Sequence, residues 1–229
     1  VNNSFGKVVN ISVDKYKLTK KSLQALQGVR YTGATTAAKV KHPRRLAANR
    51  QITASDQLWE VDLKYGYVAK EERFFYLMSF IDVYDRMIVD YHLGLSCEGK
   101  HAAQILQRAL WKRQLFETDS RPVIRSDNGP QFTSHVFEES CVKFSVEHER
   151  IPPKTPNKNA HIESFHALLE SDCLSRYEFS SYQEAYQIVI EYIQFYNERR
   201  IHGSLYDFSP CEFRQRLCAG ELKPFIIKV

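Results

Sequence analysis

An aspartate in the middle of a β-strand pattern constrains the fold of this chain more than any other feature of its sequence. In residues 58–65, LWEVDLKY, apolar side chains alternate with polar ones, and Asp62 lies on the more polar side. Such period-two alternation predicts a strand with one buried face. Aspartate has a low propensity for strands, so its presence in the middle of this one is unusual. We therefore expect a sheet with Asp62 on its more polar side.

The rest of the chain alternates further strands with helices. Residues 73–82, RFFYLMSFID, are apolar on both faces and predict an interior strand. The other expected elements are strands at 87–93, 122–126 and 144–148, helices at 99–116 and 134–142, a helix that carries Glu163, and a last helix that begins at the capping box of Ser181 and Glu184. The first three strands are closely spaced and predict an antiparallel meander. The order as a whole predicts an α/β fold, with a mixed five-stranded sheet flanked by helices.

Two further acids occupy positions that are typical of an active site. Asp127 ends the strand at 122–126 and precedes a turn at 128–130. Glu163 lies on a helix after a proline-rich loop, and 35 residues separate it from Asp127. The apolar positions of that helix fall on one arc that excludes Glu163, so its carboxyl group is able to face a cleft. Each acid alone is more often a surface charge, but their joint placement on separate elements favours one shared site.

Three carboxylates are a suitable ligand set for divalent metal ions. Cutting and joining DNA requires an activated oxygen nucleophile and neutralisation of the leaving oxygen, which two ions about 3.5–4 Å apart supply. Magnesium needs only a few protein carboxylates, because it keeps several waters and substrate oxygens. We expect Asp62, Asp127 and Glu163 to bind two Mg²⁺ ions, for which Mn²⁺ should substitute.

Five segments follow one another in the chain, namely QLWEVDLKY, FIDVYDRMIV, RSDNGPQFTS, TPNKNAHIESFHALLE and FYNERRIHGSLYDFSPCEF. In this order they resemble the retroviral-integrase-type (DDE) catalytic core of bacterial insertion-sequence transposases, close to the IS-three family. The resemblance implies a ribonuclease-H-like fold in which Asp62, Asp127 and Glu163 are the metal-binding triad of 3'-end cleavage and strand transfer. It also implies double-stranded DNA, as transposon ends and target, and a homo-oligomer, because two ends must be processed together.

Other residues near the expected site are candidates for DNA contact or for supporting roles. The DNA candidates are Lys154, Lys158 and Asn159 before the helix of Glu163, and Asn197, Arg199, Arg200 and His202 after the last helix. Arginine binds phosphate bidentately, but basic residues also favour solvated helix ends. Asn128 and His166 are candidates for supporting the triad, against ordinary roles as a turn residue and a helix-surface histidine.

Charge and composition are compatible with a DNA-binding protein without establishing one. The formal net charge is +5, and residues 38–50 hold several Lys and Arg side chains but no acid, which suits a solvated linker and a phosphate-binding arm equally. No apolar run is long enough to span a membrane, and the five scattered cysteines do not form a C-x-x-C pair. We expect a cytoplasmic bacterial protein that associates with the nucleoid.

Three regions are expected along the chain. They are an N-terminal appendage and basic linker at 1–50, a catalytic core at 51–216, and a C-terminal tail at 217–229. The appendage suits either the remnant of a DNA-binding module or a segment that packs on the core. Within the appendage the sequence predicts one short helix, at 14–27. Two alternatives to a transposase stay open: a non-catalytic DNA-binding or assembly module with the same fold, and a nuclease that only nicks DNA.

Overall fold

A five-stranded sheet forms the centre of the structure, which is a computed structural model. It describes residues 45–152 and 156–229, all within one compact unit, His42–Val229. The strands are β2 (Leu58–Val68), β3 (Arg73–Asp82), β4 (Ile88–Gly94), β5 (Val123–Ser126) and β6 (Glu147–Arg150), in the order β4-β3-β2-β5-β6. The first three form an antiparallel meander, while β5 pairs in parallel with both β2 and β6. The predicted mixed five-stranded α/β fold is confirmed.

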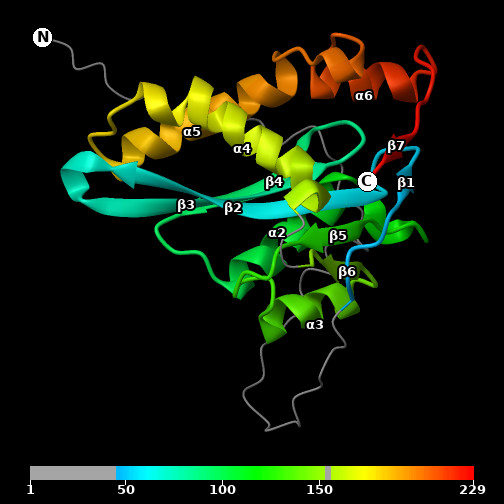
Figure 1. The fold of residues 1–229 in the computed structure, drawn as a ribbon, viewed down its shortest axis with the longest axis horizontal. Helices are drawn as coiled ribbons and strands as arrows, with labels where there is room; N and C mark the ends of the chain where they lie inside the picture. Colours follow the sequence, from blue (N-terminus) through cyan, green and yellow to red (C-terminus); the bar gives the residue numbers. More distant parts are fainter. Residues whose placement is uncertain (1–44, 153–155) are drawn as a thin grey trace, which may run out of the picture. The chain divides into compact units, whose positions relative to one another are not determined.

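Helices cover both faces of this sheet (Figure 1). Helices α4 (Ala160–Asp172) and α5 (Tyr182–Glu198) lie over one face, and α2 (Gly99–Lys112) and α3 (His135–Lys143) lie over the other. Each layer has its own core: Trp59 and Phe80 pack with the α2 side, while Leu77 and Ile81 pack with α4 and α5. Because both faces are covered, β3 is buried throughout its inner half and is mostly apolar there.

Two predicted boundaries on the α2 side were wrong. Helix α2 ends at Lys112 and not at residue 116, because Gln114 takes a left-handed conformation (φ 57°) and a 3₁₀ turn follows at Leu115–Glu117. Strand β6 begins at Glu147 instead of residue 144. There, Ser145 has a φ of 55° and turns the chain between α3 and β6. In both cases, apolar residues that lie in a turn were predicted to belong to a helix or a strand.

The sequence analysis also missed three short elements near the C-terminus. Helix α6 (Pro210–Cys218) starts at Ser209, whose hydroxyl accepts a hydrogen bond from the Glu212 amide. Strands β1 (Gln51–Ile52) and β7 (Ile227–Lys228) form a separate two-stranded antiparallel sheet. Two-residue strands that pair across most of the chain leave no periodic pattern to detect. The division at residues 50 and 216 stays a prediction, and the expected helix at 14–27 lies outside the described residues.

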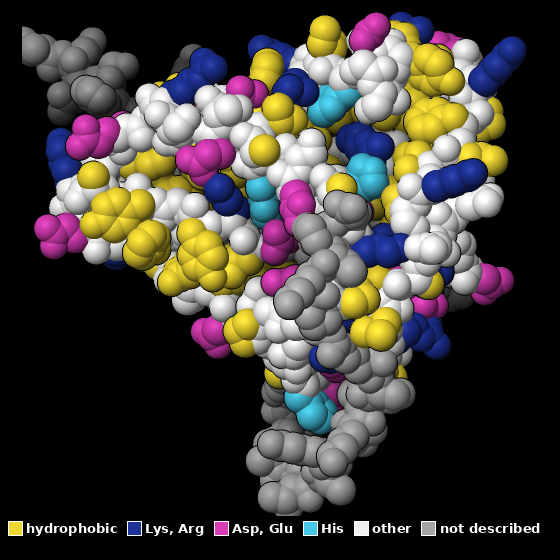
Figure 2. Space-filling view, in the orientation of Figure 1, with side chains coloured by type: hydrophobic (Ala, Val, Ile, Leu, Met, Phe, Trp, Pro, Cys, Tyr) yellow, Lys and Arg dark blue, Asp and Glu magenta, His cyan; other side chains and the backbone are white. Residues whose placement is uncertain are grey.

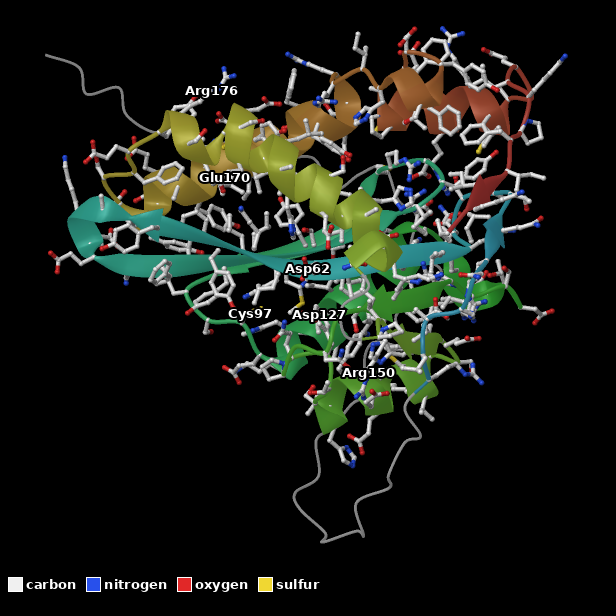
Figure 3. All side chains as sticks on the ribbon, viewed as in Figure 1. Asp62, Cys97, Asp127, Arg150, Glu170 and Arg176 are labelled. Atoms are coloured by element: carbon white, nitrogen blue, oxygen red, sulfur yellow. The ribbon has the colours of Figure 1, made fainter. Side chains whose placement is uncertain are left out.

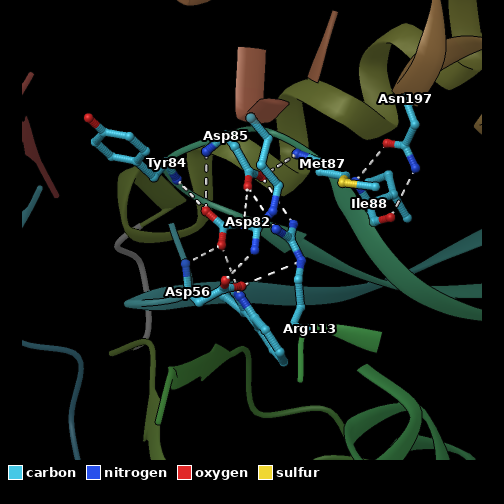
Figure 4. A network of polar contacts seen from close by, with 10 residues as sticks. Asp56, Asp82, Tyr84, Asp85, Met87, Ile88, Arg113 and Asn197 are labelled. Carbon is cyan, nitrogen blue, oxygen red and sulfur yellow. Dashed lines mark hydrogen bonds and ion pairs between the residues drawn. The ribbon is translucent and has the colours of Figure 1, made fainter. Parts of the chain in front are cut away.

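A buried ionic network joins the β3–β4 turn to α2 and α6 (Figure 4). The Asp82 carboxylate accepts hydrogen bonds from the Trp59 indole and from backbone amides, including that of Asp85. The Asp85 carboxylate pairs with Arg113 on α2 and with Arg214 on α6, both at 2.9 Å. Burial opposes ionisation of Asp85, but Arg113 and then Arg214 hold the pKa of this carboxyl below its usual range. Asp82 and Asp85 therefore have a structural role in this network.

None of the described helices combines the length and the apolar character that a membrane crossing requires.

Candidate active site

The fold places the three acids of the predicted triad on adjoining elements. Asp62 lies in the middle of β2, and Asp127 follows the last residue of β5, where Val61 and Ser126 are partners in parallel register. Figure 3 shows Asp62 on the sheet beneath α4 and Asp127 nearby at the end of its strand. Glu163 lies in the first turn of α4, which packs over β2 and β3.

The three carboxyl groups interact electrostatically. Burial raises the pKa of Asp127 above its usual range, and the negative charge of Asp62 raises it further. Burial also raises the pKa of Glu163, with additional contributions from Asp62 and then Glu60. Asp62 thus repels both of the other acids, which is the situation that a bound cation relieves. Figure 2 shows acidic side chains gathered near the middle of this face, between hydrophobic side chains on one side and basic ones on the other.

The three carboxylates are suitable ligands for divalent metal ions, although they do not form a compact group in this structure. Within residues 45–152 and 156–229, no three His, Cys, Asp or Glu side chains form a group compact enough to hold a metal ion. Carboxylate oxygens from two strands and a helix are nevertheless the hard ligands that Mg²⁺ prefers, and their mutual repulsion favours a positive charge among them.

A tight turn fixes the Asp127 side chain. Its Oδ1 accepts a hydrogen bond from the Gly129 amide at 2.8 Å. A Cβ added to Gly129 would stand 2.9 Å from that same oxygen and 2.5 Å from the Gln131 side chain. A larger residue at this position would therefore displace the side chains of Asp127 and Gln131.

A serine, a histidine and a glutamate form a relay beside Asp127. The Ser126 hydroxyl lies 2.8 Å from His148 Nε2, and His148 Nδ1 lies 3.2 Å from a Glu138 oxygen. This resembles the nucleophile, base and acid of a serine hydrolase. However, Ser126 is fully buried and its hydroxyl donates to the carbonyl of Asp127 at 2.9 Å. The relay stabilises the end of β5, and it does not present a nucleophile.

The residues predicted to support the triad lie close to it. Asn128 donates to the carbonyl of Ile151 at 3.0 Å, which is a structural contact between neighbouring loops. His166 is buried, not on the helix surface, and its Nδ1 lies 3.5 Å from the Asp62 carboxylate. Its Nε2 is buried without a hydrogen-bond partner among the described residues. A supporting role for either side chain stays a prediction, and the geometry favours it more for His166.

Three of the candidates for DNA contact have partners within the protein. Lys154 lies outside the described residues, and the Lys158 ammonium donates to the Asn49 side chain. Asn159 is buried, and its amide donates to the carbonyl of Val61 at 3.4 Å. Asn197 bonds through both amide atoms to the backbone of Ile88. These three contacts are within the protein, and DNA binding by these residues stays a prediction.

The remaining candidates lie at the end of α5. Arg199 is exposed beside Glu191 and Glu198, and Arg200 Nε lies 3.8 Å from the Asp172 carboxylate. Neighbouring acids reduce the positive potential that these arginines offer to phosphate. The basic segment before β1 is similar, because Arg50 pairs with Glu147 and Glu149 on β6.

His202 should carry little positive charge at neutral pH. Burial, together with the charges of Arg200 and Arg86, lowers the pKa of its imidazole from 6.5 to about 4. Because the folded-state pKa is depressed, its stabilising contribution is present above pH 6.5 and is lost as the pH falls from there towards 4. For this partly exposed group the loss should be on the order of 1 kcal/mol. We expect His202→Gln to flatten the decline of unfolding free energy in that range, measured by urea denaturation at several pH values. If the unfolding free energy of His202→Gln falls with pH as steeply as that of wild type, the His202 imidazole is not held neutral in the folded protein.

Sequence analysis missed the roles of two buried charges at this site. Glu60 is 1% exposed and Arg125 is fully buried, and they are partners on the neighbouring strands β2 and β5. Neither residue was predicted to belong to the site. The available signal was a charged residue two positions before each aspartate of the triad.

Two descriptions of the integrase core domain match the chain, one over residues 52–156 and the other over residues 144–210. This chain belongs to the integrase core family. The predicted resemblance is confirmed.

Relatives of this integrase core come from bacterial insertion elements. The 31 kDa protein of insertion element IS600 from Shigella sonnei is 32% identical over 169 residues, covering 72% of this chain and 59% of that protein. The putative transposase InsK of insertion sequence element IS150 from Escherichia coli strain K12 is 27% identical over 174 residues, covering 76% and 60%. The chain spans about half to six tenths of the length of the curated relatives it matches.

A solved structure shows the same fold. The catalytic core domain of HTLV-2 integrase, in complex with magnesium and in a trimeric form, has a TM-score of 0.50 and 13% sequence identity to this integrase core. The match covers 69% of this chain and 96% of that one. The predicted ribonuclease-H-like fold is confirmed.

Proposed function

We propose that this integrase core cuts the 3' ends of transposon DNA and joins them to target DNA, with Asp62, Asp127 and Glu163 as its catalytic triad. One observation carries the proposal. Asp62 on β2 interacts electrostatically both with Asp127, directly after the neighbouring parallel strand β5, and with Glu163 on the helix over the sheet, in a chain of the integrase core family.

Divalent ions, when bound, would supply a nucleophile at neutral pH and stabilise charge on the leaving oxygen. The protein residues provide position. Asp62 is held by the β2–β3–β4 meander, and Asp127 is held by the Gly129 amide and by the Ser126 hydroxyl at its carbonyl. Glu163, on the more exposed side, completes the ligand set from α4. The pKa of Asp127 and the pKa of Glu163 are both raised, so ionisation of these carboxyl groups is unfavourable unless a positive charge is nearby.

The proposed partners are double-stranded DNA, as transposon ends and target, and further copies of the chain. Relatives are named as transposases of insertion sequences, and the related viral core domain is described in a trimeric form. Two transposon ends must be handled in one reaction, which favours an assembly with more than one active site. A cytoplasmic location at the nucleoid follows from this proposal.

A strand-transfer assay tests the function directly. Labelled, pre-cut transposon-end DNA and a plasmid target are incubated with wild type or Asp127→Asn, in Mg²⁺, Mn²⁺ or EDTA. We expect joined products with wild type in either metal, and none with EDTA or with Asp127→Asn. The two alternatives give different results: metal-dependent nicking without joining indicates a nuclease, whereas DNA binding without any reaction in a complete assembly indicates a non-catalytic module.

A further inference from the structure

The helix that carries Glu163 is capped by a side chain from the strand that carries Asp62. Glu60 Oε2 accepts hydrogen bonds from the backbone amides of His161 at 2.9 Å and Ile162 at 3.0 Å. Its Oε1 lies 2.8 Å from His161 Nδ1. Helices leave their first amides without internal partners, and a local N-cap side chain usually accepts from them. Here the acceptor comes from a residue 101 positions earlier in the chain.

The residue at the N-cap position does not perform this role. Asn159 makes no side-chain capping bond, and its amide donates to the carbonyl of Val61 instead. The start of α4 is therefore attached to β2 by Glu60 and Val61, the two residues immediately before Asp62. An attachment to the strand fixes where the helix begins relative to the sheet, which a local cap would not do.

A second buried charge holds the segment immediately before α4. Arg125 on β5 is the partner of Glu60 in parallel register. Its Nη1 donates to the carbonyl of Lys158 at 3.2 Å, and Glu149 holds the same guanidinium at 2.7 Å. Two buried charges therefore hold segment 158–162. The Arg125 guanidinium binds the carbonyl at its start, and the Glu60 carboxylate binds the two amides at its end. Each charge lies on a strand, two residues before one of the two aspartates of the triad.

We propose that Glu60 is a positioning residue that sets the place of Glu163 relative to Asp62 and Asp127, with Arg125 holding the preceding residue. This inference rests on the proposed function, because it concerns the metal-binding geometry of the triad. Glu163 is the residue immediately after the second capped amide, so a shift in the helix start displaces its carboxylate directly. Residues that orient metal ligands typically change metal affinity or activity by about 10- to 100-fold when replaced.

Two substitutions of Glu60 separate position from charge. Glu60→Leu removes the cap and keeps an apolar side chain of similar size in the buried site. Glu60→Gln keeps the cap. Its amide oxygen accepts hydrogen bonds from both backbone amides, and its amide nitrogen donates to His161 Nδ1. The matched control is Glu170→Leu, on the exposed side of the same helix, where Glu170 pairs with Lys64. Asp62→Asn provides the baseline for metal bound outside the triad.

Two measurements on the full chain report on these variants. Hydrogen exchange of the His161 and Ile162 amides should become about tenfold faster in Glu60→Leu and stay near wild type in Glu60→Gln. The dissociation constant for Mn²⁺, measured from the electron paramagnetic resonance of the free ion, should rise about tenfold in Glu60→Leu and less than about threefold in Glu60→Gln and the control.

The possible outcomes are distinct. Faster exchange in Glu60→Leu with unchanged Mn²⁺ affinity would overturn the positioning role, as would unchanged exchange. An equal loss of affinity in Glu60→Gln and Glu60→Leu would mean that the negative charge matters and the position does not. If Glu60→Leu does not fold, Glu60→Gln decides, because a tenfold loss there contradicts the proposal. If wild type binds Mn²⁺ no better than Asp62→Asn, the proposed function fails and the inference fails with it.

Discussion

Replacing Glu163 by glutamine should lower the rate of DNA strand transfer by about a thousandfold or more. The substitution keeps the size of the side chain but removes the anionic oxygen that a metal ligand requires, and several kcal/mol of transition-state stabilisation correspond to a loss of this size. The loss should appear in the rate constant of joining under saturating DNA, measured with pre-cut ends in Mg²⁺. Because Glu163 is exposed in the first turn of α4, the fold should be retained.

Glu170→Gln is the matched control for this prediction. Glu170 lies two turns further along α4, is exposed, and pairs with Lys64 at 2.7 Å. Its neutralisation changes the net charge of the helix by the same amount, so the joining rate should stay within about threefold of wild type, as an exposed ion pair contributes little. Comparable losses in both variants would indicate a general effect of charge on DNA binding, and full activity of Glu163→Gln would remove Glu163 from the triad.

The largest stability loss is expected when Arg125 is replaced by methionine. This guanidinium is fully buried and pairs with Glu149, which is also fully buried, at 2.7 Å. It donates further to the carbonyls of Ala48 at 2.9 Å and Lys158 at 3.2 Å. Removing one partner leaves a buried carboxylate and two carbonyls with fewer partners, which should reduce the free energy of unfolding by about 3–5 kcal/mol. Urea denaturation followed by circular dichroism measures this loss.

Arg216→Met provides the comparison for the buried pair. Arg216 and Glu212 form a half-exposed ion pair on α6, one helical turn apart, at 3.0 Å. Its removal should cost less than about 1 kcal/mol. If Arg125→Met is no more destabilising than Arg216→Met, then Arg50, which also contacts Glu149, compensates for the missing charge, and the buried pair is not what holds β5 to β6.

Elements that have a local sequence pattern could be predicted from the sequence. The alternation around Asp62, the apolar run of β3 and the capping box at Ser181 each specify an element, and all three elements form where they were expected. The triad was predicted because its acids stand in recognisable motifs around a strand, a turn and a helix. Their arrangement in the structure follows from the parallel pairing of β2 with β5.

The contacts that attach these elements to one another could not be predicted in the same way. Glu60 seemed an ordinary polar residue on a strand, because the amides that it caps lie a hundred positions later. Asn159 was predicted as a candidate for DNA contact, yet it lies at the N-cap position of α4 and its side chain donates to the carbonyl of Val61 on β2. A sequence pattern specifies which face of an element is buried, but the partner of a buried charge depends on tertiary packing.

The segment that precedes β1 also determines which rim of the sheet is accessible. Leu46 forms a parallel bridge with Arg150, and the amide of Ala47 donates to the Arg150 carbonyl at 2.9 Å. The backbone donors and acceptors on that rim of β6 are therefore partly used within the same chain. Another copy cannot easily extend the sheet there by adding a strand, which protects the protein from uncontrolled aggregation along β6. Subunits that assemble on this side must recognise side chains, and such contacts can be specific and reversible.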